Sequence, residues 1–142
     1  MNISAKTEYA CIAVLELAAS YGSGEPVRIK HIAETHGIPS RFLVQILLQL
    51  KGAGLVISTR GASGGYQLAQ DPKEISLLDV MSVIEGPQSE HASGATQNTP
   101  QSRVLWRAWK EVATAEREML AETTFSALVE AAKGVSESMY YI

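Results

Sequence analysis

The 142-residue sequence predicts a mainly α-helical fold of the α+β class, namely a winged helix–turn–helix with a long C-terminal dimerisation helix. Three observations lead to this prediction. Two helical stretches are joined by a turn that contains glycine, two short strand-like stretches with a glycine-rich tip follow them, and a long amphipathic stretch lies near the C-terminus. We expect a winged domain over residues 1–85, a flexible loop over residues 86–101, and the dimerisation helix with its tail over residues 102–142.

Composition and charge narrow the class of protein. At 46% hydrophobic residues the chain can bury a core, and its single cysteine excludes a disulfide framework within one chain. We expect a cytoplasmic protein with no membrane association, because the sequence shows neither a signal-peptide pattern nor an apolar run near the roughly 18 residues of a membrane span. The net charge of −3 hides an asymmetry: residues 1–75 carry seven Lys and Arg against six Asp and Glu, whereas residues 76–142 carry five against nine.

Two helices are predicted in the N-terminal part. The first spans residues 4–20, because Ser4 can cap it and apolar residues recur at helical spacing until a stretch with Gly and Pro breaks it. The second spans residues 29–36 and ends at Gly37, which can take the left-handed conformation that a tight turn requires. Ala33 supplies the small side chain that is needed where two helices of a helix–turn–helix cross.

The third helix is predicted over residues 39–53, with Pro39 at its first helical position. Leu43 is expected to anchor this helix in the core, as the second helix of a helix–turn–helix requires. The apolar face of the helix is expected to comprise Phe42, Leu43, Ile46, Leu47 and Leu50. The remaining side of the helix is then free to contact a partner.

A β-hairpin is predicted over residues 56–69, because two strand-like runs flank the glycine-rich tip of the segment "RGASGGYQL". The letters GASGG also match G-x-S-x-G, the nucleophile elbow of hydrolases, with Ser63 as the nucleophile. A nucleophile elbow needs a helix directly after the serine, whereas a strand-like run follows here. We therefore expect no enzyme, and neither of the two phosphate-loop patterns occurs in the sequence.

The C-terminal half is predicted to contain a helix over residues 77–86 capped by Ser76, a long helix over residues 102–122, and a short helix in the tail. The long helix carries an apolar stripe that a small domain can hardly cover by itself. We interpret this stripe as a dimer interface, with packing inside one chain as the alternative. The stripe comprises Leu105, Trp109, Val112 and Met119, and Trp106 and Leu120 beside it complete the expected interface.

The predicted helix 39–53 and the predicted wing carry side chains suited to double-stranded DNA. Arginine can pair with guanine and glutamine with adenine in the major groove, and an arginine on a wing suits a narrow minor groove. The expected contacts are Ser40, Arg41, Val44 and Gln45 from the helix, Thr59, Arg60, Gly61, Ser63 and Gly64 from the wing, and Lys6, Arg28, Lys30 and Lys51 to phosphates. The polar residues could equally form a solvated face, and Val44 and Leu48 could either meet thymine methyl groups or pack in the core.

Three segments resemble those of a known family, the Rrf-type winged-helix transcriptional regulators. They are "ISAKTEYACIAVLELA" (residues 3–18) at the start, "IAETHGIPSRFLVQILLQLKGAGLV" (residues 32–56) at the helix–turn–helix, and "STRGASGGYQLA" (residues 58–69) at the wing. The resemblance is close over residues 1–86 and extends to the long helix by architecture. It implies a homodimeric bacterial transcription regulator, usually a repressor, that binds a palindromic operator and places its wing arginine, here Arg60, in the minor groove.

The resemblance also bears on cofactors. Family members that hold a [2Fe–2S] or [4Fe–4S] cluster use cysteines in the loop before the long helix, and residues 86–101 contain none. The sequence therefore resembles the cluster-free members, which need no such cofactor or metal and are regulated by a partner protein, a small molecule or a thiol. Cys11 lies in an apolar stretch and is interpreted as a core residue.

Two other interpretations stay open. The chain could be a winged-helix interaction module that no longer binds DNA, because its basic charge is modest and Val44 and Leu48 are apolar. It could also be a metal or redox sensor with non-cysteine ligands, for which the candidates are Glu8, Glu90 and His91.

Overall fold

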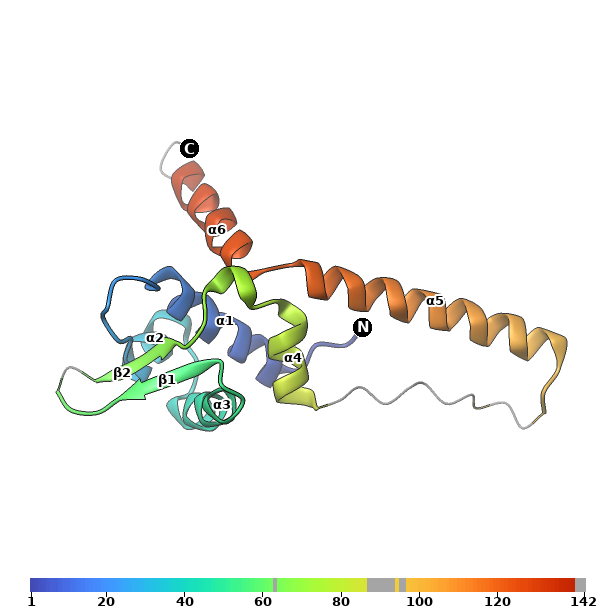
Figure 1. The fold of residues 1–142 in the computed structure, drawn as a ribbon, viewed down its shortest axis with the longest axis horizontal. Helices are drawn as coiled ribbons and strands as arrows, with labels where there is room; N and C mark the ends of the chain where they lie inside the picture. Colours follow the sequence, from blue (N-terminus) through green and yellow to red (C-terminus); the bar gives the residue numbers. More distant parts are fainter. Residues whose placement is uncertain (63, 87–93, 95–96, 140–142) are drawn as a thin grey trace.

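The computed structural model describes residues 1–62, 64–86, 94 and 97–139 of the chain. The elements in chain order are α1 (Ala5–Ala19), α2 (Ile29–His36), α3 (Ser40–Gly52), β1 (Val56–Thr59), β2 (Gly65–Leu68), the 3-10 helix η1 (Pro72–Glu74), α4 (Leu77–Glu85), α5 (Pro100–Glu122) and α6 (Phe125–Met139). In Figure 1, α1 to α4 and the hairpin form one body, α5 runs out from this body, and α6 rises beside it. The arrangement confirms the predicted winged helix–turn–helix.

α1 is the central helix of the body, and it packs against α3, α4, α6 and β2. It begins where the hydroxyl oxygen of Ser4 accepts a hydrogen bond from the backbone N–H of Thr7 at 3.1 Å, so the predicted cap is confirmed. Thr7 is fully buried, and its hydroxyl donates to Glu85 at the end of α4 at 2.8 Å. This bond connects the first turn of α1 to α4. It also gives the buried hydroxyl a partner, without which the hydroxyl would destabilise the fold.

α2 and α3 form the helix–turn–helix. Gly37 ends α2 with a φ of 66°, which is the left-handed conformation expected from the sequence. α3 begins one residue later than predicted, because Pro39 has a ψ of 129° and precedes the first helical residue. Four of the five residues predicted for the apolar face of α3 are fully buried: Leu43, Ile46, Leu47 and Leu50.

Phe42 is the exception on this face, because it is 38% exposed. Its ring packs on Tyr9 of α1, with 6.3 Å between the ring centroids, and the guanidinium of Arg41 lies over it at 5.1 Å from the centroid. The prediction that Phe42 belongs to the buried face was wrong. The elements packed on α3 cover a narrower arc than its apolar residues occupy, so Phe42 lies at the edge of that arc.

β1 and β2 form a two-stranded antiparallel sheet, in which Val56 faces Leu68 and Thr59 faces Gly65. Tyr66 of β2 also exchanges two backbone hydrogen bonds with the segment before α2, at 2.9 and 2.8 Å. The wing is therefore attached to the helix–turn–helix. Because a strand follows the GASGG letters, the geometry of a hydrolase elbow is absent here, as predicted.

The C-terminal helices have defined starts. Ser76 and Asp79 form a capping box at α4, in which each side chain accepts the backbone N–H of the other residue, at 3.2 and 2.9 Å. α5 begins at Pro100 rather than at residue 102, because Thr99 caps it. α6 is longer than the short helix predicted, and its Phe125 is fully buried in the core.

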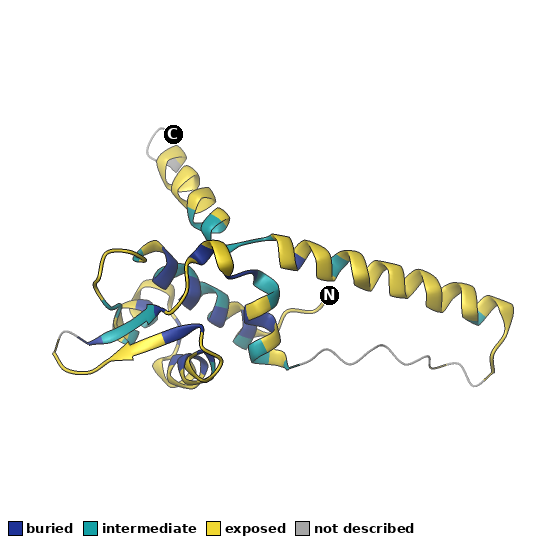
Figure 2. Cartoon of the chain, viewed as in Figure 1, coloured by how far each residue is buried: buried dark blue, intermediate teal, exposed yellow. Residues whose placement is uncertain are grey.

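α5 leaves the body and is exposed along most of its length (Figure 2). Its 23 residues span roughly 35 Å at 1.5 Å per residue. No helix in the described part of the chain combines the length and hydropathy needed to cross a membrane.

Candidate nucleic-acid interface

The exposed face of α3 is the first part of the candidate interface. Four exposed side chains lie within about 100° of arc around the helix axis, opposite the buried residues: Arg41, Val44, Gln45 and Leu48. Val44 is 42% exposed and Leu48 is 56% exposed, so the alternative that they pack in the core was wrong. Ser40 is exposed at the N-terminal end of the same helix.

Two contacts show which elements flank this face. The Lys51 ammonium donates a hydrogen bond to the Ser58 hydroxyl of β1 at 2.7 Å, and Lys51 lies two turns after Val44 on the same side of α3. On the other side, Phe42 contacts Tyr9 of α1. The exposed face of α3 is therefore bounded by the wing on one side and by α1 on the other.

The tip of the wing is a tight turn. Arg60 follows β1 and is exposed, and Gly61 has a φ of 103°, which favours glycine. The backbone N–H of Gly64 donates to the carbonyl of Gly61 at 2.9 Å and closes the turn. Gly64 is buried, and a Cβ there would overlap the carbonyl oxygen of Thr59. The turn of the wing therefore requires glycine at this position. Ser63 lies outside the described residues.

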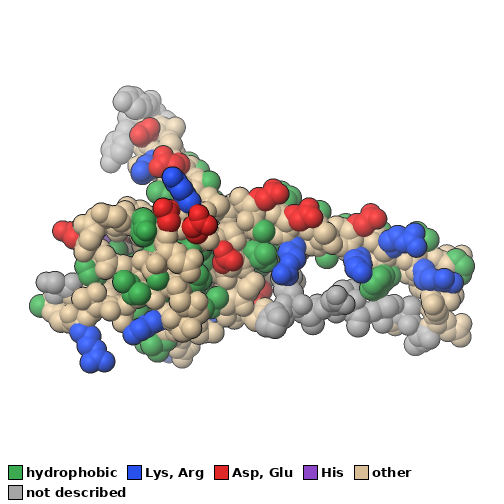
Figure 3. Space-filling model, viewed as in Figure 1, with side chains coloured by type: hydrophobic (Ala, Val, Ile, Leu, Met, Phe, Trp, Pro, Cys, Tyr) green, Lys and Arg blue, Asp and Glu red, His purple; other side chains and the backbone are tan. Residues whose placement is uncertain are grey.

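The segment that forms α3 and the hairpin carries positive side chains and no negative ones. Residues 35–70 contain Arg41, Lys51 and Arg60 and no Asp or Glu. In Figure 3, basic side chains lie at the lower left over the hairpin and α3, whereas acidic and basic side chains are mixed along α5 and at the base of α6. Such a surface attracts the phosphate backbone of a nucleic acid even though the whole chain has a net charge of −3.

The other predicted phosphate contacts lie at the starts of helices. Arg28 directly precedes α2 and is exposed. Lys30, in the first turn of α2, lies 3.9 Å from Glu34, and both side chains are largely exposed. A surface ion pair of this kind is weak, so Lys30 remains able to contact a phosphate. Lys6, in the first turn of α1, is half-buried.

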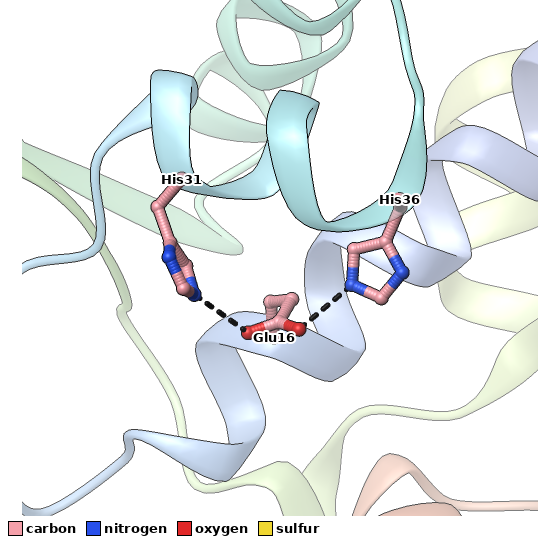
Figure 4. A network of polar contacts seen from close by, with 3 residues as sticks. All are labelled: Glu16, His31 and His36. Carbon is pink, nitrogen blue, oxygen red and sulfur yellow. Dashed lines mark hydrogen bonds and ion pairs between the residues drawn. The ribbon is translucent and has the colours of Figure 1, made fainter.

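A carboxylate on α1 contacts two histidines of α2 (Figure 4). Glu16 Oε1 lies 2.7 Å from His36 Nε2, and Glu16 Oε2 lies 3.7 Å from His31 Nε2. The two histidines stand near opposite ends of α2, so one carboxylate contacts both its first and its last turn. These contacts link α2, and the turn that leads into α3, to α1.

A second exposed surface runs along α5. Its residues recur at alternating spacings of four and three, which is the pattern of a helix that packs against another helix: Leu105, Trp109, Val112, Glu116 and Met119. The exposed fractions of the apolar members are 57% for Leu105, 58% for Trp109, 57% for Val112 and 70% for Met119. Packing inside one chain, the alternative interpretation of the stripe, does not cover these four residues.

Three residues in or beside this stripe have partners within the chain. Leu120 is buried at 8% exposure, because α5 rejoins the body at its C-terminal end. The prediction that Leu120 lies on the exposed surface of the helix was therefore wrong. The Lys110 ammonium lies over the Trp106 ring at 5.1 Å from the centroid. Glu116 interrupts the stripe and lies 3.9 Å from the α-amino group of Met1.

Of the three candidate metal ligands, only Glu8 lies in the part of the chain that the structure describes. Cys11 is half-buried on α1, and burial raises the pKa of its thiol to about 11. Glu8 is exposed in the first turn of the same helix, and Glu90 and His91 lie outside the described residues. Within the part of the chain that the structure describes, no group of three or more His, Cys, Asp or Glu side chains is placed to bind a metal ion.

Sequence reasoning did not find three of these contacts. Each contact joins two different elements: Ser58 of β1 is the partner of Lys51 on α3, Tyr9 of α1 is the partner of Phe42 on α3, and Glu16 of α1 contacts His31 and His36 of α2. A pattern read along one segment carries no signal for a partner on another segment.

Comparison with known proteins gives similar sequences and structures among transcriptional regulators. Residues 3–131 match the family Rrf2, described as an iron-dependent transcriptional regulator. The HTH-type transcriptional regulator CymR of Bacillus subtilis (strain 168) is 37% identical over 143 residues, which cover 100% of each chain. The solved structure of CymR, the global cysteine regulator of B. subtilis, is similar with a TM-score of 0.81 at 34% identity, over 92% of this chain and 98% of CymR. IscR of T. potens is similar with a TM-score of 0.76 at 32% identity, over 93% of this chain and 88% of IscR.

Proposed function

The chain belongs to the Rrf2 family of DNA-binding transcriptional regulators, which are not enzymes, and we propose that it is a homodimeric repressor that reads a palindromic operator. One observation carries the proposal. α3 and the wing form a single exposed surface, joined by the Lys51–Ser58 hydrogen bond, and the segment that forms it contains Arg41 and Arg60 but no acidic residue.

In this proposal α3 lies in the major groove and the wing lies over the adjacent minor groove. Arg41 can donate two hydrogen bonds to guanine, and Gln45, one turn later, can pair with adenine. Arg60 enters the minor groove, where the negative potential of a narrow groove stabilises a guanidinium. Arg28 and Lys30 at the start of α2 contact phosphates, which sets the register without reading the sequence.

Homodimerisation through α5 is the second part of the proposal. The exposed fractions of Leu105, Trp109, Val112 and Met119 support it, because large apolar side chains along one helix face are unfavourable in water until another surface covers them. A two-fold dimer presents two recognition helices to half-sites about 34 Å apart, which requires a palindromic operator.

The residues present do not fit an iron–sulfur cluster, although the family is described as iron-dependent. Such clusters are held by several cysteine thiolates, and each chain has one cysteine. Cys11 is half-buried, and the raised pKa of its thiol keeps it protonated at neutral pH. The proposal is therefore a cluster-free regulator whose signal is a partner protein or a small molecule.

Binding to DNA from upstream of the protein's own gene, followed by fluorescence anisotropy, tests the DNA-binding part. We expect an affinity that falls steeply with salt, because phosphate contacts release counterions. Arg60→Ala should lower the affinity about tenfold or more, whereas Lys133→Ala, which removes one positive charge from α6, should have little effect. Weak, sequence-independent binding that is indifferent to Arg60 would support an interaction module that no longer binds DNA.

Two further measurements test the repressor and the cofactor parts. Transcription from a reporter fused to the operator should rise when the protein is removed from the cell, and a fall would identify an activator. Iron and sulfide analysis of protein purified without oxygen should find neither in stoichiometric amount. Stoichiometric iron together with sulfide would contradict the cluster-free proposal.

A further inference from the structure

Val44 and Leu48 are apolar side chains in the middle of the candidate DNA surface. They are 42% and 56% exposed. They stand one helical turn apart, with roughly 6 Å between their Cβ atoms, and so form a short apolar ridge along α3. Arg41 and Gln45 form a polar row beside this ridge.

The ridge lies on the wing side of α3. Lys51 is two turns after Val44 on the same side of the helix, and its ammonium is hydrogen-bonded to Ser58 of the wing. When α3 lies in the major groove, Arg41 and Gln45 reach one set of base pairs. The ridge faces the neighbouring base pairs, which lie nearer to the wing. It therefore addresses positions that the polar row does not read.

Base edges in the major groove present one apolar group, the C5 methyl of thymine. The roughly 6 Å spacing of the ridge corresponds to about two base-pair steps of 3.4 Å. Resting on the proposed function above, we propose that Val44 and Leu48 determine specificity by contacting the methyl groups of two thymines in each operator half-site.

The surroundings of the ridge favour DNA over a protein partner. The segment over residues 35–70 contains three basic residues and no acidic residue, which complements the phosphates on either side of a groove. A ridge of two side chains is also small beside the apolar patches of several hundred Å² that mark protein interfaces. Phe42, also exposed on α3, is partly covered by Tyr9 and Arg41 and lies on the side away from the wing.

Replacing thymidine with 2′-deoxyuridine removes the methyl group and leaves base pairing unchanged, so it tests this contact directly. The operator is first selected from genomic fragments that the wild-type protein binds. Each thymidine is then replaced singly and symmetrically in the two half-sites. At two of these positions, we expect the wild-type affinity to fall about three- to fivefold for each half-site that is changed. This is the effect of one lost methyl contact. Replacement at the other positions should leave the affinity unchanged.

Two alanine variants assign the sensitive positions. Val44→Ala should abolish the loss at one position, and Leu48→Ala should abolish it at the other. Gln45→Ala serves as the matched control, because it should weaken binding without changing either loss. Alanine is a strong helix former and the replaced side chains are exposed, so α3 should stay folded, which circular dichroism verifies.

Unchanged affinity of the wild-type protein for every deoxyuridine operator overturns this inference and leaves a protein partner as the occupant of the ridge. A loss that persists in both alanine variants also overturns it. In either case, binding that falls with salt and requires Arg60 leaves the proposed function intact. If no operator-specific binding occurs at all, the proposed function and this inference fail together.

Discussion

The Lys51 ammonium nitrogen lies 2.7 Å from the Ser58 hydroxyl oxygen, so the last turn of α3 is hydrogen-bonded to the first strand of the wing. The bond joins the two elements that we place in adjacent grooves of DNA. Because both side chains are exposed, the bond contributes little to stability. Its effect should appear in DNA binding, where Lys51 can both hold the wing and contact a phosphate.

Ser58→Ala removes this hydrogen bond, whereas Lys51→Ala removes the bond and a positive charge. We expect Ser58→Ala to weaken operator binding only about two- to threefold, with no change in the salt dependence. Lys51→Ala should weaken it further and reduce the slope of log affinity against log salt by about 0.9, the value for one phosphate contact. Anisotropy titrations over a salt series measure both effects. Equal losses with equal slopes would show that Lys51 holds the wing and contacts no phosphate.

Trp109→Asp should make the protein monomeric. It places a carboxylate in the centre of the apolar stripe of α5, where burial against a second copy would desolvate the charge. Its helical content should not change, because Trp109 is 58% exposed in the single chain. Size-exclusion chromatography with light scattering measures the mass. Arg107→Asp, on the opposite side of α5, is the control and should stay dimeric. A dimeric Trp109→Asp variant would place the interface elsewhere.

Cys11 should react slowly with alkylating reagents. Burial raises the pKa of its thiol from 9.0 to about 11. The thiolate fraction below pH 9 is therefore about a hundredfold lower in the folded protein than in the unfolded chain. Alkylation followed by mass spectrometry at pH 8, with and without denaturant, measures the ratio of rates. Equal rates in the two states would contradict a buried thiol and reopen a redox role.

The same shift predicts a dependence of stability on pH. Because the folded-state pKa is raised, the unfolded thiol ionises first, and unfolding releases a proton between pH 9 and about 11. This contribution to stability is fully present below pH 9 and is lost as pH rises through the folded-state value. Comparing the wild type with Cys11→Ala by urea denaturation across this range isolates the effect of the thiol, since both proteins share every other titrating group.

Gly64→Ala should destabilise the protein by about 1–3 kcal/mol, because the new Cβ overlaps the carbonyl oxygen of Thr59 across the turn of the wing. Gly52→Ala is the matched control. Gly52 lies in the last turn of α3, and a Cβ added there would meet nothing within 4 Å beyond the backbone of its own helix, so alanine should stabilise the helix by up to about 1 kcal/mol. Urea denaturation measures both. An unchanged stability of Gly64→Ala would show that the turn opens at little cost.

Helix ends were predicted well because they depend on short-range chemistry. Ser4 and Ser76 cap their helices through bonds to backbone groups three residues away, and Gly37 ends α2 through its own φ angle. Each signal lies within one turn of the position that it determines. The start of α5 was placed two residues late, because the cap formed by Thr99 was not identified.

The candidate DNA surface was predicted in part. The exposed face of α3 and the place of Arg60 on the wing follow from helical periodicity and from the hairpin pattern. Phe42 and Leu120 were assigned to the wrong environments, because the arc of α3 that is covered and the point where α5 rejoins the body depend on other elements.

The sequence by itself determined the order of the elements and the family, because capping residues, glycines and periodicity act within a few positions and the family motifs are contiguous. Only the tertiary structure decided that Val44 and Leu48 remain on the surface, that Leu120 does not, and that Lys51 meets Ser58. The physical reason is that burial and side-chain pairing depend on which other element packs against each face, and a pattern within one element does not contain that information.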